Sequence, residues 1–176
     1  MIRARLLLIA GAVLLPVPVA IARHEGHGGV QQACAALPAE LAAWTGARVK
    51  RKAAPSPAKL ASAALPVGQA VEAVLLPMTK LSFAVQPEKP GGSVSKGGLF
   101  RVDIAEAGTY RVALGSEPWI DVIEKGAALP SIAHGHGPEC SGIRKMVDYE
   151  MQAGPHILQI SGNGDAALTL MVVRLR

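Results

Sequence analysis

The chain has 176 residues, half of them hydrophobic, with 18 Lys and Arg against 13 Asp and Glu and a formal net charge of +5. Arg3 and Arg5 belong to the extreme amino terminus, so 16 basic residues face 13 acidic ones in the remainder, an excess of three. This small and scattered excess argues against nucleic-acid binding. Only two Trp, two Tyr and two Phe are present, which leaves no aromatic platform for stacking bases or sugars.

Residues 1–22 have the order of a secretory signal peptide. Arg3 and Arg5 precede an apolar run, LLLIAGAVLLPVPVAIA, that ends at Ala22. The run is short for a membrane span and is interrupted by two prolines, so we expect cleavage after Ala22 rather than retention as an anchor. The expected mature chain is periplasmic or secreted, has no stable membrane span, and keeps about 150 residues, the size of one domain.

Residues 23–64 are expected to form an N-terminal arm, one short helix and a basic linker. The arm, RHEGHGGVQQ, has no apolar period. The Ala- and Leu-rich stretch AALPAELAAW predicts the helix, with Pro38 at a first helical position. Segment 47–64 combines Lys50-Arg51-Lys52 with Pro, Ser and Ala, and is interpreted as a solvated connector. A membrane-facing or acidic-partner role for the basic run is the alternative.

From residue 65 the hydrophobic period changes to two, which predicts β-strands separated by Gly-, Pro- and Asn-rich turns about every ten residues. Connections this short leave no room for crossover helices, so antiparallel pairing is expected. The domain at 65–176 is therefore predicted to be mainly β, an antiparallel β-sandwich or jelly roll. The expected strands cover 67–75, 81–85, 100–104, 110–114, 119–123, 143–149, 156–160 and 168–175, with an irregular loop at 87–98.

Cys34 and Cys140 are the only cysteines. In an exported chain such a pair is more often a disulfide than two free thiols. The bridge would tether the segment after the N-terminal arm to the sequence AHGHGPECSG at 133–142. The alternative makes Cys140 a metal thiolate beside His134 and His136.

His134 and His136 make this loop a candidate transition-metal site. Neutral imidazole suits Zn, Cu and Fe, and two histidines with one carboxylate is a known iron-binding set. Glu139 and His156 are the additional donors that the sequence offers. The opposing interpretation is a Gly- and Pro-rich surface loop whose histidines are solvated.

A second histidine pair, His24 and His27, lies close to the expected mature amino terminus. A terminal amine with a nearby histidine can chelate Cu or Ni, although an unstructured tail with incidental histidines is the preferred interpretation. The HExxH metalloprotease pattern is not met, because only two residues separate the histidines. A Cys34–Cys140 bridge would hold this pair within reach of the loop at 133–142.

Two long stretches of the chain, PEKPGGSVSKGGLFRVDIAEAGTYRVALGSEPWIDVIEKG and AHGHGPECSGIRKMVDYEMQAGPHILQI, resemble small exported bacterial proteins that carry the name homogentisate 1,2-dioxygenase. The resemblance covers about 85 to 176, and HGHGPECSGIRKMVD is its most specific part. The spacing F-x-V, AGTY-x-V-x-L and AG-x-x-x-L-x-I is also similar to bacterial pre-peptidase C-terminal β-sandwich domains, which are accessory or binding modules.

The dioxygenase resemblance implies a non-haem iron enzyme that opens an aromatic ring with dioxygen, its iron held by two His and one Glu. The donors would come from His134, His136, Glu139 and His156. In cupin enzymes of that activity three or four residues stand between the second His and the Glu, whereas two separate His136 from Glu139 here. The second cupin motif is matched by a segment around Gly154 that is one residue short.

The sequence thus supports three hypotheses and identifies no catalytic residue. The first is an exported β-sandwich binding or accessory module that holds one transition metal ion, Cu, Zn or Fe, and has a small molecule or an envelope protein as partner. The second is an iron-dependent, ring-cleaving dioxygenase. The third is a structural envelope-interaction protein without a small ligand. The oligomeric state stays open.

Overall fold

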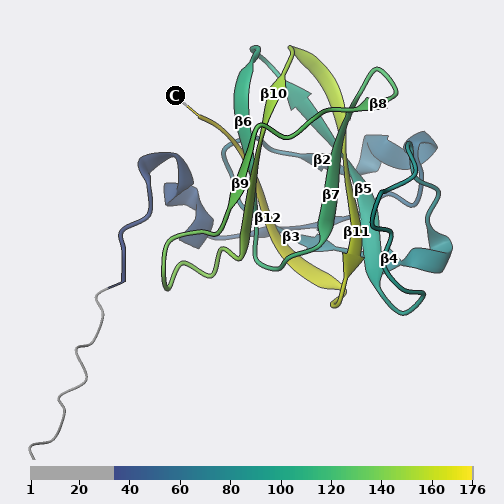
Figure 1. Cartoon of the computed structure of the whole chain (residues 1–176), viewed down its shortest axis with the longest axis horizontal. Helices are drawn as coiled ribbons and strands as arrows, with labels where there is room; N and C mark the ends of the chain where they lie inside the picture. The colour runs from purple at the N-terminus through teal and green to yellow at the C-terminus, as the bar shows by residue number, and fades with distance from the viewer. Residues whose placement is uncertain (1–33, 176) are drawn as a thin grey trace, which may run out of the picture. The chain divides into compact units, whose positions relative to one another are not determined.

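The computed structural model describes residues 34–175. The expected signal segment and the pair His24 and His27 lie outside these residues. Two β-sheets pack against each other, as Figure 1 shows, and the predicted β-sandwich is confirmed. Within the described residues no helix has the length and apolar character needed to cross a membrane.

The first sheet, sheet A, has six strands. It is built around β6 and its two antiparallel neighbours, β12 and β10. In spatial order its strands are β1 (Val49–Lys52), β3 (Val71–Val74), β12 (Ala167–Arg174), β6 (Gly108–Leu114), β10 (Lys145–Met151) and β9 (Ala133–Gly135).

The second sheet, sheet B, is built around β11, the longest strand. In spatial order its strands are β2 (Ala64–Leu65), β5 (Lys96–Ile104), β11 (Gly154–Asn163), β7 (Trp119–Glu124) and β8 (Ala127–Ala128). A further short strand, β4 (Leu76–Pro77), pairs with the beginning of β5. The alternating pattern of the sequence therefore located the central strands of both sheets.

Both sheets are mixed, so the expectation of purely antiparallel pairing is wrong at two places. β1 pairs with β3 in parallel, and β2 pairs with β5 in parallel. Parallel neighbours need a long connection. Here the chain leaves sheet A after β1, forms the 3-10 helix η2 (Pro57–Ser62) and β2 in sheet B, and then returns to β3.

The segment 47–64, expected as a solvated connector, is instead part of the sandwich. It supplies β1 and the start of β2, and three of its alanines, Ala53, Ala54 and Ala63, are buried. Ala53 lies against Gly98 of β5, where any added Cβ would come within 2.2 Å of the alanine Cβ. The Lys and Arg residues of β1 suit an edge strand, because charged side chains discourage pairing with another chain.

The expected strand at 81–85 is also absent from the described structure. The 3-10 helix η3 (Met78–Lys80) precedes this segment, and the backbone of Ala84 and Val85 bonds to a side chain of sheet B. Gln159 accepts hydrogen bonds from the N–H groups of Ala84 and Val85 at 2.6 and 3.1 Å and donates one to the carbonyl of Val85 at 3.0 Å. A buried amide side chain thus replaces a neighbouring strand.

The expected N-terminal helix is the 3-10 helix η1 (Ala39–Thr45), which packs on the outer face of sheet A. Leu41 and Trp44 are buried there in a second apolar cluster that includes Met171 and Ile143. The main core lies between the sheets, with Phe100 among its largest fully buried side chains. The N-terminal segment is therefore a layer added to one face of the sandwich.

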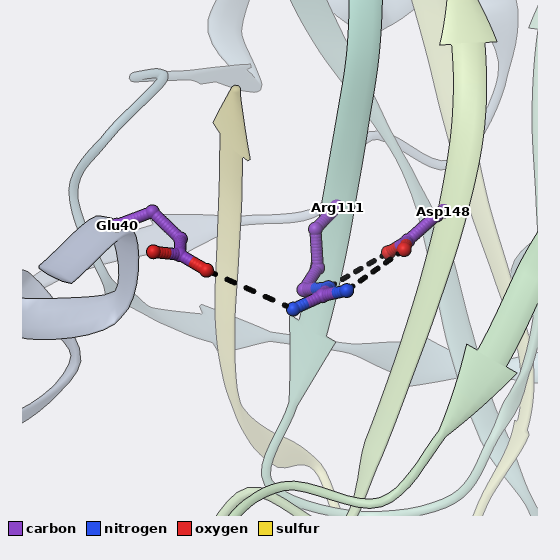
Figure 2. Close-up of polar contacts among 3 residues, drawn as sticks. All are labelled: Glu40, Arg111 and Asp148. Carbon is purple, nitrogen blue, oxygen red and sulfur yellow. Dashed lines mark hydrogen bonds and ion pairs between the residues drawn. The ribbon is translucent and has the colours of Figure 1, made fainter. Parts of the chain in front are cut away.

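An ion-pair network also attaches η1 to sheet A, as Figure 2 shows. Arg111 of β6 donates from Nε and Nη2 to the two carboxylate oxygens of Asp148 in β10, both at 2.8 Å. Its Nη1 lies 4.0 Å from Oε1 of Glu40 in η1. The hydrogen bond to Asp148 is the main reason that the pKa of Arg111 is raised.

Candidate functional site

One end of β7 is a free strand edge. β8 pairs only with Ile123 and Glu124, so among residues 34–175 no strand pairs with Trp119, Ile120 and Asp121 on that side. Side chains from sheet A bond to the carbonyl groups of this edge. Lys145 Nζ donates to the Pro118 carbonyl at 2.7 Å, and the Tyr149 hydroxyl donates to the Ile120 carbonyl at 3.4 Å.

A cavity of about 480 Å³ opens at this edge, lined by residues of β7 in sheet B and of β9 and β10 in sheet A. The volume is within the range of small-molecule sites. Polar groups and apolar walls both line it, among them Trp119, Asp121, Leu129, His134, Lys145 and Tyr149.

Burial shifts the pKa values of three of these side chains. It raises the pKa of Asp121 above 3.8, although the Trp119 indole N–H, which donates to this carboxylate at 2.9 Å, opposes the rise. Burial lowers the pKa of Lys145 below 10.5 and raises that of the Tyr149 hydroxyl. A carboxyl group with a raised pKa and an amine with a lowered pKa in the same cavity are typical of functional sites.

Two lysines lie close to the indole of Trp119. The Nζ atoms of Lys89 and Lys145 are 4.9 and 5.7 Å from the ring centroid, within range of a cation–π interaction. The ring therefore helps to hold positive charge at the cavity, which favours a ligand with an anionic group.

The loop that follows β9 is held to the N-terminal segment by a disulfide. Cys34 and Cys140 are bonded, with 5.5 Å between their Cα atoms, so the predicted disulfide is confirmed. The Trp44 indole N–H also donates to the Ser141 carbonyl at 2.9 Å. The bridge leaves no Cys140 thiolate for a metal, and it ties the histidine-containing loop to the layer formed by η1.

The structure brings His134 and His136 to one surface depression of about 200 Å³, which Glu117 and Lys145 also line. His134 belongs to β9 and reaches the main cavity as well. His136 Nδ1 lies 2.7 Å from the Arg144 carbonyl, so this nitrogen carries the proton of a neutral ring and Nε2 keeps its lone pair.

The other two predicted donors lie elsewhere. Glu139 lines a second hollow on the loop, which His136 and Cys140 also line, and it does not reach the depression shared by His134 and His136. His156 belongs to β11 of the opposite sheet, is 2% exposed, and has its Nε2 3.6 Å from Oε2 of Glu124. Within residues 34–175 no three His, Cys, Asp or Glu side chains are grouped closely enough to hold a metal ion.

Sequence reasoning missed the carboxyl and the amine of the cavity. In the sequence, Asp121 lies in an expected strand and has no apparent partner. The available signal was the period of β10, in which Lys145 has the same parity as the core residues Val147 and Tyr149 and so must face inward. An inward lysine is rare without a partner or a cavity.

The fold and this site define a disulfide-linked β-sandwich protein with a charged cavity at the open edge between its sheets. No protein-family model matches the chain, and the comparison with curated proteins also finds no match. Function is therefore inferred from the chemistry of the cavity, because a β-sandwich alone hosts many functions.

Proposed function

We propose that this protein is an exported binding module that takes a small zwitterionic molecule, such as a free amino acid, into the cavity between its sheets. One observation carries the proposal. The half-buried carboxyl of Asp121 and the half-buried amine of Lys145 line the same cavity of about 480 Å³. Export is supported by the signal-like order of residues 1–22 and by the disulfide, since structural disulfides persist in oxidising compartments.

The chemistry of the two groups matches the two ends of a zwitterion. Lys145 donates to a ligand carboxylate, and Asp121 accepts from a ligand ammonium group. Both charges are partly desolvated, so a ligand that pairs with them recovers interactions lost on burial. Leu129 and Val147 provide an apolar wall for the ligand side chain.

Replacing either charged group should weaken binding of leucine by about 10- to 100-fold, the equivalent of one hydrogen bond to a charged group. The variants are Lys145→Met and Asp121→Asn, with Lys50→Met as the matched control because the Lys50 side chain is 74% exposed and lies at the far edge of sheet A. Isothermal titration calorimetry provides the affinities.

Two ligands that each lack one charge complete this test. Isocaproate lacks the ammonium group of leucine and should lose affinity for the unmodified protein, as should isoamylamine, which lacks the carboxylate. Equal affinity for all three molecules, or no binding of any amino acid, would contradict the proposal.

The affinity for leucine should decline toward both ends of the pH range. As the pH falls, Asp121 is protonated through a pKa raised above 3.8, and its pairing with the ligand ammonium is lost. As the pH rises, Lys145 loses its proton through a pKa lowered below 10.5, and its pairing with the ligand carboxylate is lost. In a plot of affinity for leucine against pH, Lys145→Met should reduce the decline at high pH and Asp121→Asn the decline at low pH. The titration of leucine itself affects every variant equally.

A second candidate function is binding of one transition metal ion by His134 and His136. The orientation of His136 favours it, because a histidine that binds a metal through one ring nitrogen usually donates a hydrogen bond from the other, as Nδ1 does here to the Arg144 carbonyl. Two imidazoles would leave several coordination positions to water or to a ligand in the adjoining cavity. Ring cleavage at iron is less well supported, since His156 belongs to the opposite sheet.

The double variant His134→Ala with His136→Ala should abolish stoichiometric binding of Zn or Cu. Glu139→Gln is the matched control and should keep it, because Glu139 does not line the depression that His134 and His136 share, although His136 also lines the hollow of Glu139. Equilibrium dialysis followed by elemental analysis measures the bound metal. Unchanged binding in the double variant would refute this site.

A further inference from the structure

We infer that the cavity holds a reactive amine, and that Lys145 captures small aldehydes and ketones there as imines. The inference rests on the proposed use of the cavity as a binding site and extends it to a second class of ligand, carbonyl compounds. The cavity volume of about 480 Å³ accommodates molecules of this size.

The position of Lys145 distinguishes it from the surface lysines. It lies on the inward face of β10, the same face as Val147 and Tyr149, and is half-buried at the cavity wall. By contrast, the side chains of Lys50 and Lys125 are 74% and 85% exposed. Lys145 alone among these three presents its amine to an enclosed space where a bound carbonyl carbon can be held against it.

Burial of the amine shifts its protonation equilibrium toward the neutral, nucleophilic form. Burial is the largest influence and lowers the pKa of Lys145; Lys89 acts in the same direction, whereas the carboxylates of Glu117 and Asp121 act against it. The Pro118 carbonyl accepts one N–H of Lys145 at 2.7 Å. A neutral amine held by one of its N–H bonds keeps its lone pair free for attack on a carbonyl carbon.

The cavity also contains groups that can move the protons of this reaction. The amine nitrogen forms a bond to the carbonyl carbon, the carbonyl oxygen takes up a proton, and the nitrogen loses one, which gives a carbinolamine. Loss of water then forms the C=N bond and needs a proton on the departing hydroxyl. Asp121, whose pKa burial raises, interacts electrostatically with Lys145 and is placed to supply that proton.

Reductive trapping tests the inference on the intact, unmodified protein. Propanal and sodium cyanoborohydride are added at neutral pH, where hydride reduces any imine to a stable secondary amine. Peptide mapping by mass spectrometry then gives the rate of modification at each lysine. We expect Lys145 to be modified faster than Lys50 and Lys125 in the folded protein, and at the same rate as both in urea.

The replacement Lys145→Arg keeps the positive charge and should remove the fast modification, while Lys50→Arg should leave it unchanged. Fast trapping at Lys145 supports the inference even if leucine does not bind, in which case the proposed zwitterion specificity fails alone. Modification of Lys145 no faster than that of Lys50 in the folded protein overturns the inference, whatever the result with leucine.

Discussion

Replacing Cys34 and Cys140 together by Ser should lower the free energy of unfolding by about 4 to 5 kcal/mol, the value that chain entropy assigns to a loop of about 100 residues. The bridge joins positions 106 residues apart, so its main effect is to restrict the unfolded chain. Both cysteines are exposed, and little packing is lost with them. Urea denaturation followed by circular dichroism measures the change.

Thiol titration of the denatured, non-reduced protein is the control for this result. It should detect no free thiol, because the two cysteines of the sequence are bonded to each other. Two titratable thiols would contradict both the bridge and the expected loss of stability. Wild-type protein treated with a reductant should unfold at the same urea concentration as the double Ser variant.

Replacing Trp44 by Ala should lower the free energy of unfolding by about 3 to 5 kcal/mol, the usual range for loss of a large buried aromatic side chain. Trp44 is 2% exposed and packs with Leu41, Ile143 and Met171 between η1 and sheet A. Its indole N–H also bonds to the Ser141 carbonyl, so the change releases the histidine-containing loop from η1.

Trp44→Phe is the matched variant, because it keeps one aromatic ring at this position and removes the indole N–H. It should cost about 1 to 3 kcal/mol, mainly the effect of leaving a partly buried carbonyl without its donor. Circular dichroism during urea denaturation measures both variants without using tryptophan fluorescence. If Trp44→Ala lowered the free energy of unfolding by less than Trp44→Phe does, η1 would not be packed on the sheet.

The two changes act on the same N-terminal layer and should not be additive. With the bridge removed, η1 is attached to sheet A by its apolar contacts and by the Glu40–Arg111–Asp148 network. Part of the stabilisation that Trp44→Ala removes is then already absent. The combined variant should therefore be more stable than the sum of the separate effects predicts.

The alternation of apolar and polar residues located the central strands, because the two-residue period depends only on near neighbours in the chain. The stretches 100–104, 110–114, 119–123 and 168–175 lie within or overlap β5, β6, β7 and β12. The β-sandwich could be inferred from these strands. The disulfide could be inferred because the sequence has only two cysteines. The parallel pairs could not be predicted from the alternation, because β1 and β2 begin in segment 47–64, which has no strand pattern.

Only the tertiary structure decided which segments meet. Val49–Lys52 is a basic stretch in the sequence, yet it becomes an edge strand because β3 offers it hydrogen-bonding groups and its charges can remain in water. Residues 81–85 have the period of a strand, yet Ala84 and Val85 bond to the side chain of Gln159, more than seventy positions later, and not to a neighbouring strand. The cavity has the same origin: Asp121 and Lys145 are brought together by the meeting of two sheet edges, and contacts of this kind depend on distant partners that no local pattern encodes.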